Sequence, residues 1–209
     1  IWAYQNFGYL NILFDHGKES TNYKRELDLV TGTAETKYTI GRTEYTRNYF
    51  TSLADKVGVV QLKANSKKAI SFALHYYRDE NIENYQIDDD QIAIHGRLPD
   101  GFGGYNNNFN GFFKVIRKGG SIQNYDNQII IKDADEVTII FSLSTSYYGH
   151  NPQEHVENTV KKVEKLSYKQ LLKRHLNAYQ PIFNRVKLNL PNDNASADLP
   201  TTQRIANFF

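Results

Sequence analysis

The densest group of side chains that could perform acid–base chemistry is the acidic run Asp88-Asp89-Asp90. Hydrolysis of a glycosidic bond uses two carboxyl groups about 5–10 Å apart, whereas adjacent residues of a hairpin point in divergent directions. A second group, formed by Asp133, Asp135 and Glu136, also precedes a strand in the manner of a turn. Both groups are therefore expected to be solvated turns, and the sequence predicts no catalytic residue within this chain.

The six histidines do not form a metal-binding pattern. Zinc sites combine histidine with thiolates or place two histidines at positions i and i+4 of a helix, and the sequence has no cysteine. His150 and His155 are five residues apart around a helix start, which is a weak signal. His175 belongs to an apolar helix stripe and is expected in the core. The sequence predicts no metal site and no cofactor.

The glycine-rich segment at residues 101–104 has the composition of a phosphate-binding loop but not its context. Such a loop precedes a helix, whereas asparagines and a strand from residue 111 follow here. We predict a long loop over residues 97–111, and long loops are often functional. Its aromatic residues Phe102, Tyr105 and Phe109 are candidates for stacking on sugar rings or for contacting a neighbouring domain. A loop with no binding role is an equal alternative.

Length and composition are those of a globular protein with one main hydrophobic core. The 209 residues are 40% hydrophobic and 23% charged, which is ordinary for this class. The net charge of +2 does not favour nucleic acid as a partner. No apolar run reaches the roughly 20 residues of a membrane-spanning helix, so no membrane association is expected, and no signal peptide opens the segment.

Period-two alternation over most of the chain predicts a mainly β protein. Residues 23–29 and 34–40 alternate between apolar and polar side chains, as strands with one buried face do. Further strands are predicted over residues 44–51, 57–64, 69–77, 91–96, 111–117, 128–132 and 136–144. Roughly ten short strands at spacings of about 8–12 residues predict an antiparallel β-sandwich, of the super-sandwich type.

A short helical linker region is predicted after the strands. Asn151 followed by Pro152 is typical of a helix start. Ser167 and Gln170 form a capping box ahead of an apolar stripe that includes Leu171, Leu172 and His175. A polar connector is predicted over residues 191–200, and Thr201 is expected to begin a last helix.

Several strings resemble glycoside hydrolase family 95, and they occur in the same order over nearly the whole chain. The most specific are the Tyr-x-Arg-x-Leu-Asp-Leu string at residues 23–29 and the tail segments at residues 175–186 and 199–204. The segments at residues 4–10 and 45–52 agree with them. The chain is thus similar to the amino-terminal domain and helical linker of that family.

This resemblance implies an inverting α-L-fucosidase, or a relative that acts on α-L-galactosides. The family joins a large β-sandwich and a helical linker to an (α/α)6 barrel that carries the catalytic groups, and none of those groups falls within this chain. The implied division is a sandwich over residues 1–148 lacking upstream strands, a linker over 149–185, and a connector and truncated barrel start over 186–209. The implied partners are that barrel and a fucosylated or related glycan, and we expect a secreted or periplasmic bacterial protein.

Three interpretations of the function remain at this stage. The first is a non-catalytic domain that supports the barrel and shapes the substrate cleft, inactive by itself. The second is an autonomous carbohydrate-binding module, and the third is the sandwich of a disaccharide phosphorylase. The absence of methionine and the apolar last residues favour a segment of a longer protein. We therefore expect exposed apolar surface and self-association of the fragment.

Overall fold

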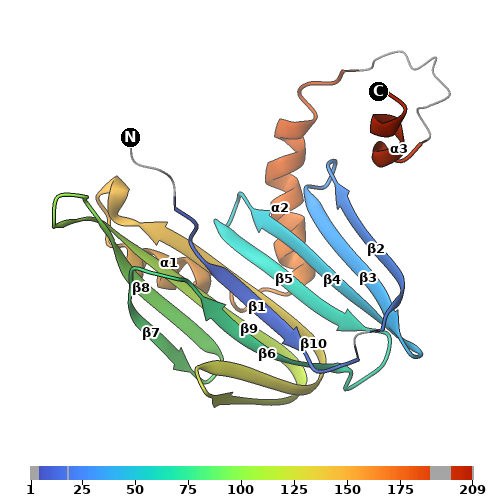
Figure 1. The fold of residues 1–209 in the computed structure, drawn as a ribbon, viewed down its shortest axis with the longest axis horizontal. Coiled ribbons are helices and arrows are strands. Elements are labelled where there is room, and N and C mark those ends of the chain that lie inside the picture. Colours follow the sequence, from blue (N-terminus) through green and yellow to red (C-terminus); the bar gives the residue numbers. More distant parts are fainter. Residues whose placement is uncertain (1–4, 18, 189–198, 209) are drawn as a thin grey trace.

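Antiparallel strands followed by helices make up the residues that the computed structural model describes, 5–17, 19–188 and 199–208 (Figure 1). The strands are β1 (Tyr9–Phe14), β2 (Thr21–Asp28), β3 (Thr33–Ile40), β4 (Thr43–Ser52), β5 (Val57–Ala64), β6 (Ile70–Tyr77), β7 (Ile82–Asp88), β8 (Gln91–Pro99), β9 (Tyr105–Tyr125) and β10 (Gln128–Thr145). The helices are η1 (Ser146–Tyr148), α1 (Pro152–Lys161), α2 (Tyr168–Phe183) and α3 (Thr201–Ala206). No helix in these ranges is both long enough and apolar enough to cross a membrane.

The strands form one continuous sheet that folds into two layers. The larger layer has the order β2-β3-β4-β5-β10-β9-β8-β7, and β6 and β1 extend from another part of β10. The segment from Glu136 to Phe141 pairs with β5, whereas the segment from Ile129 to Ala134 pairs with β6. Every pairing is antiparallel, so the predicted antiparallel β-sandwich with following helices is confirmed.

The β9–β10 hairpin passes from one layer to the other at a bulge. The register between these strands shifts between Ala134, which pairs with Gly119, and Glu136, which pairs with Lys118, and Gly120 follows directly after Gly119. Both glycines have positive φ, as does Asp133, and bulges of this kind bend a strand out of the plane of its sheet. A Cβ atom on Gly120 would lie 2.2 Å from the carbonyl oxygen of Lys132. The crossing therefore requires glycine for both its dihedral angle and its space.

The main core lies between the two layers, and alternating side chains of several strands fill it. Ile70, Phe72 and Leu74 of β6 are at most 2% exposed and face Ile92 and Ile94 of β8 across the same cluster. This alternation is the period-two signal that the sequence carries.

A second core lies on the opposite face of the larger layer, where helices cover the sheet (Figure 1). Val156 and Val160 lie one helical turn apart on α1 and pack with Phe50 and Ile140 of the sheet. Asn151 caps α1 by accepting hydrogen bonds from the backbone N–H groups of the first turn. The predicted helix start is therefore confirmed.

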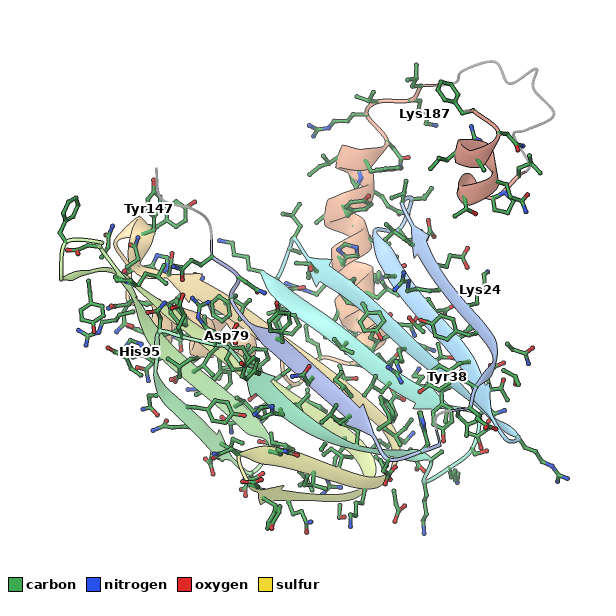
Figure 2. The ribbon with its side chains drawn as sticks, in the orientation of Figure 1. Lys24, Tyr38, Asp79, His95, Tyr147 and Lys187 are labelled. Atoms are coloured by element: carbon green, nitrogen blue, oxygen red, sulfur yellow. The ribbon has the colours of Figure 1, made fainter. Side chains whose placement is uncertain are left out.

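Arg47 closes one end of the main core through its guanidinium group. This group lies 4.2 Å from the centre of the Phe14 ring and 4.9 Å from that of Tyr38. It also donates a hydrogen bond of 2.6 Å to the Tyr38 hydroxyl, which lies 2.7 Å from Nε2 of His16. Figure 2 shows where Tyr38 lies at this end of the sheet. The aromatic rings cover the charge at the margin of the core, a cation–π arrangement.

One prediction about the strands is wrong, and one strand was not predicted. The predicted loop over residues 97–111 is mostly strand, because β8 continues to Pro99 and β9 begins at Tyr105. Pairing with β8, joined by pairing with β10 from Phe109 onwards, holds these asparagine-rich residues in the sheet, despite their low intrinsic strand preference. The strand β7 was not expected. The predicted connector over residues 191–200 lies outside the described residues except for Leu199 and Pro200.

The edge strands expose apolar side chains. Tyr9 and Leu13 on β1 are 54% and 55% exposed, and Tyr23 and Leu27 on β2 are 61% and 64% exposed. Each strand has one sheet neighbour among the described residues, β6 for β1 and β3 for β2. The expected exposed apolar surface is present, and self-association through it stays a prediction.

The bulge at Gly120 gives a prediction with a matched control. Gly120→Ala and Gly41→Ala both place a side chain at positive φ, which costs about 1–2 kcal/mol. Only Gly120→Ala also forces a close contact, whereas Gly41 has open space around it, so Gly120→Ala is expected to lose about 1–3 kcal/mol more. Urea unfolding of both variants measures the difference. Equal losses would show that the crossing tolerates a side chain.

Candidate functional site at the α2 junction

The three aromatic residues predicted to contact sugar or a neighbouring domain do not lie on one surface. Phe102 is 91% exposed and Tyr105 is 60% exposed, with the Arg97 guanidinium 4.3 Å from the Tyr105 ring centre. Phe109 is only 2% exposed and packs edge to face against Phe7 at 5.4 Å. Phe109 is therefore a core residue that offers no open ring face. For Phe102 and Tyr105 a binding role stays a prediction.

The turn that carries Phe102 is a short, internally bonded connection between β8 and β9. Oδ1 of Asp100 accepts hydrogen bonds of 2.8 Å from the backbone N–H groups of Phe102 and Gly104. These bonds lower the pKa of Asp100. The Asp100 carboxylate therefore stabilises the shape of the turn, and it is not paired with another group for acid–base catalysis.

A second pair of exposed aromatic residues lies close to β9. This pair was not predicted from the sequence. Tyr147 and Tyr148 in η1 are 72% and 82% exposed, and their rings meet edge to face at 5.1 Å. The backbone N–H of Asn108 donates to the hydroxyl of Ser146, which ties η1 to β9. Figure 2 shows Tyr147 at this end of the sandwich. The signal in the sequence is the dipeptide itself, placed between a strand and a helix cap.

The first acidic group, Asp88-Asp89-Asp90, lies at the predicted turn. The predicted turn at Asp133, Asp135 and Glu136 is wrong, because these residues lie inside β10 around its bulge, where Glu136 pairs with strands on both sides. Asp89 has positive φ in the β7–β8 turn, and Asp90 forms an ion pair of 2.7 Å with Lys114. In the described ranges no three or more histidine and carboxylate side chains are arranged to hold a metal ion. His175 is 2% exposed, which confirms its predicted place in the core.

The helix α2 begins at the predicted capping box. The Ser167 hydroxyl accepts from the backbone N–H of Gln170, and the Gln170 side chain accepts from the backbone N–H of Ser167. Of the predicted apolar stripe, Leu171 and His175 are buried and Leu172 is half-buried. The first half of α2 therefore packs tightly on the outer face of the sheet near β4 (Figure 1).

An aromatic stack runs along α2 from the sheet outwards. The His175 ring stacks on Phe50 at 5.0 Å and on Tyr179 at 5.4 Å, and Tyr179 stacks on Phe183 at 5.5 Å. Offset stacking of this kind contributes beyond the burial of the rings. The stack links a β4 core residue to the far end of the helix.

The same helix binds three consecutive carbonyl groups of the β2–β3 turn. His175 Nε2 lies 2.9 Å from the carbonyl oxygen of Thr31, the Tyr179 hydroxyl donates to that of Leu29 at 2.7 Å, and the Gln180 amide donates to that of Val30 at 3.3 Å. Carbonyl groups in a turn have no ladder partner and must find one elsewhere. The turn and the helix therefore fix each other's position.

An ion pair between a buried carboxylate and the half-exposed Arg174 holds the first half of α2 to the β4–β5 turn. The Asp55 side chain is 1% exposed, and its Oδ1 accepts from Nε and Nη2 of Arg174 at 2.8 and 2.7 Å. Its Oδ2 accepts from the Ser52 hydroxyl at 2.9 Å. The carboxylate raises the pKa of Arg174. A buried carboxylate is tolerated only when it is paired and hydrogen-bonded in this way.

These contacts define a class of protein: an antiparallel sandwich domain firmly joined to a helix that follows it. Residues 2–150 match the family model described as "Glycosyl hydrolase family 65, N-terminal domain", and the chain belongs to this family. Residues 167–209 match "Glycosyl hydrolase family 95 catalytic domain". The second match confirms the resemblance to family 95, and it begins at the cap of α2.

Two named relatives are similar to this chain along almost its whole length. "Alpha-L-fucosidase 2" of Arabidopsis thaliana is 28% identical over 244 residues, which cover 99% of this chain and 29% of that protein. "Probable alpha-fucosidase A" of Aspergillus niger is 28% identical over 218 residues, 95% of this chain and 27% of that protein. The chain thus spans less than a third of the length of either relative.

A solved structure shows the same fold. The structure titled "Putative kojibiose phosphorylase from human microbiome" has a TM-score of 0.59 and 13% identity, covering 81% of this chain and 27% of that one. At this identity the likeness concerns the fold alone. By its family match, the chain is an amino-terminal domain of the kind found in glycosyl hydrolases.

The ion pair at Asp55 gives the first prediction for this site. Arg174→Ala leaves a buried carboxylate without its cation, so it is expected to lower the melting temperature clearly. Lys161→Ala is the matched control, because Lys161 pairs with Glu157 on the exposed face of α1, and such pairs contribute about 0.3–0.5 kcal/mol. Thermal unfolding of the two variants measures the contrast. Melting temperatures that fall alike would remove Asp55 as an anchor of α2.

The second prediction concerns alkaline pH. Burial raises the pKa of Tyr168 to about 12, whereas tyrosine in an unfolded chain titrates near pH 10. The stability that neutral Tyr168 contributes is therefore full below about pH 10 and lost by about pH 12. Tyr168→Phe should flatten the fall in unfolding free energy over this window, measured by urea unfolding. Tyr125→Phe, at an exposed position, should keep the wild-type fall, and equal curves for both would contradict the prediction.

Proposed function

We propose that this chain is the non-catalytic amino-terminal part of a longer glycoside hydrolase that resembles inverting α-L-fucosidases, and that it holds the first helix of the catalytic domain in place. One observation carries the proposal. The helix α2 lies within the catalytic-domain match, yet its contacts are with the sandwich. One element is therefore shared by both parts of the protein.

The chemistry of the described residues supports a role without catalysis. The carboxylates with the most defined surroundings, Asp55 and Asp100, are engaged in structural hydrogen bonds. Asp90 is paired with Lys114. Acid and base groups for glycoside hydrolysis must face a common substrate, and these carboxylates belong to three separate turns. The proposed source of the activity is the remainder of the catalytic domain.

The strong contacts between α2 and the sandwich support a role in positioning the catalytic domain, in preference to simply tethering it. A flexible linker would have few contacts with the sandwich, whereas α2 has an ion pair to the buried Asp55 carboxylate, three bonds to one turn and a continuous aromatic stack. Catalytic groups must be held to within a fraction of an ångström of their productive geometry. A helix fixed on a rigid sandwich can transmit such precision to the domain that follows.

A second candidate role is contact with the glycan, and the exposure of Phe102 and Tyr105 favours it. Exposed aromatic rings are suited to stacking on the apolar faces of sugars. Such a surface would shape the substrate cleft of the whole enzyme, or bind glycan as an autonomous module. Titration of the isolated chain with fucosylated oligosaccharides distinguishes the two, because only an autonomous module should bind tightly by itself.

The test of the proposed function compares the isolated chain with the longer polypeptide. The 209-residue chain is expected to leave aryl α-L-fucosides unhydrolysed, because the acid and base groups are proposed to belong to the remainder of the catalytic domain, while the longer polypeptide hydrolyses them. Release of the aryl group measures both. Turnover that stays with the repurified chain would contradict a non-catalytic role. In the longer polypeptide, Tyr179→Phe should shorten the thermal half-life of activity and leave KM unchanged, whereas a contact with substrate at Phe102 would change KM in Phe102→Ala.

A further inference from the structure

We propose that an exposed apolar surface at the outer end of α2 is the seat on which the remainder of the catalytic domain packs. This surface, called here the α2–turn patch, consists of Leu29 and Val30 in the β2–β3 turn and Ile182, Phe183 and Val186 at the end of the helix. The inference rests on the proposed function, because it names the part of the longer protein that the sandwich holds.

The two halves of the patch form one continuous surface. The carbonyl oxygens of Leu29 and Val30 accept hydrogen bonds from Tyr179 and Gln180 of α2. Phe183 stacks on Tyr179 one helical turn further along. The turn and the end of the helix therefore lie against each other, as Figure 1 shows for the tips of β2 and β3 beside α2.

The apolar side chains of the patch are open to solvent although their backbone is fixed. Leu29, Val30 and Ile182 are 60%, 52% and 51% exposed, and Val186 is 81% exposed. Contiguous exposed apolar surface on a well-ordered framework is the usual mark of a protein interface. A preformed surface of this kind also loses little conformational freedom when it binds.

The patch continues an interface that already exists. The apolar stripe of α2 begins with Leu171 against the sheet, where it is fully buried, and passes through His175 and Tyr179 to Phe183. Only the outer part of the stripe has no sheet beneath it (Figure 1). The same helix face is thus covered by the sandwich at one end and requires a second cover at the other.

The comparisons identify the occupant. The match to the catalytic domain starts at residue 167 and includes the whole of α2, yet it is shorter than the about 50 residues of the smallest typical domains. The segments that match this chain make up only 29% and 27% of the two relatives. A catalytic domain that includes α2 must pack against the free part of that helix, and the β2–β3 turn lies directly beside it.

Hydrogen–deuterium exchange of the isolated chain and of the longer polypeptide tests the proposal. Backbone amides around residues 29–32 and 179–186 are expected to exchange at least about tenfold more slowly in the longer polypeptide, which corresponds to about 1.4 kcal/mol. Peptides from the β9–β10 turn, at residues 124–128, serve as the internal control and should exchange alike in both. Equal exchange at the patch would overturn the proposal. Protection that appears in the isolated chain only as its concentration rises would identify a second copy as the occupant and also overturn it.

Two variants make the test specific. Val30→Asp and Ile182→Asp change exposed side chains, so they should leave the melting temperature of the isolated chain unchanged but lower that of the longer polypeptide. Tyr125→Asp, which changes an exposed aromatic residue away from α2, is the matched control and should affect neither. If the three variants have the same effect in the longer polypeptide, the patch is not the seat of the catalytic domain.

The two proposals can fail separately. A longer polypeptide that protects the patch but does not hydrolyse fucosides would retain the docking surface and reject the proposed substrate class. A longer polypeptide that hydrolyses fucosides but leaves the patch unprotected would support the proposed substrate class and reject the docking surface.

Discussion

The whole sandwich depends on the long β9–β10 hairpin, because this hairpin takes part in both layers: it is central in the larger layer, and β10 joins it to β6 in the smaller one. Its outer segment pairs with β5 and β8, and its segment beyond the bulge pairs with β6. The two layers could not share one hairpin if it stayed straight, so the bend at Gly119 and Gly120 sets their separation and the core between them. The edge strands β1, β2 and β7 are reached only through this pair.

The helices depend on the same hairpin through the second core. Ile140 of β10 and Phe112 of β9 present side chains to the outer face, where Val156, Val160 and Leu171 cover them. Once this face is covered, the sheet offers polar anchors at its ends: the buried Asp55 carboxylate in one turn and the free carbonyl groups of the β2–β3 turn. Apolar burial brings α2 to the sheet, and the directional bonds set its rotation and register.

The parts of this structure that could be predicted from sequence are those that local residues determine. The capping box at Ser167, the cap at Asn151 and most strands follow from spacing within a few residues, and the core position of His175 follows from its helical stripe. The partners of these groups could not be predicted, because Thr31 lies 144 positions from His175 and Asp55 lies 119 positions from Arg174. The strand content of residues 105–110 was missed for the same reason, since pairing with β8, and with β10 at Phe109 and Asn110, overrides the weak strand preference of asparagine. The burial of Phe109 follows from that pairing.

The two ends of α2 differ in the kind of interaction that they offer, and this difference explains how one helix can serve two domains. The first half begins at its own cap and is fixed by an ion pair and a buried leucine, whose partners lie in the sandwich. The outer half is fixed through Tyr179 and Gln180 but leaves Ile182 and Val186 exposed. Polar anchors give a unique geometry, whereas apolar surface is non-directional and accepts a partner of complementary shape. A helix that is oriented by polar anchors, and whose apolar surface is covered by a partner, transfers the rigidity of the sandwich to that partner.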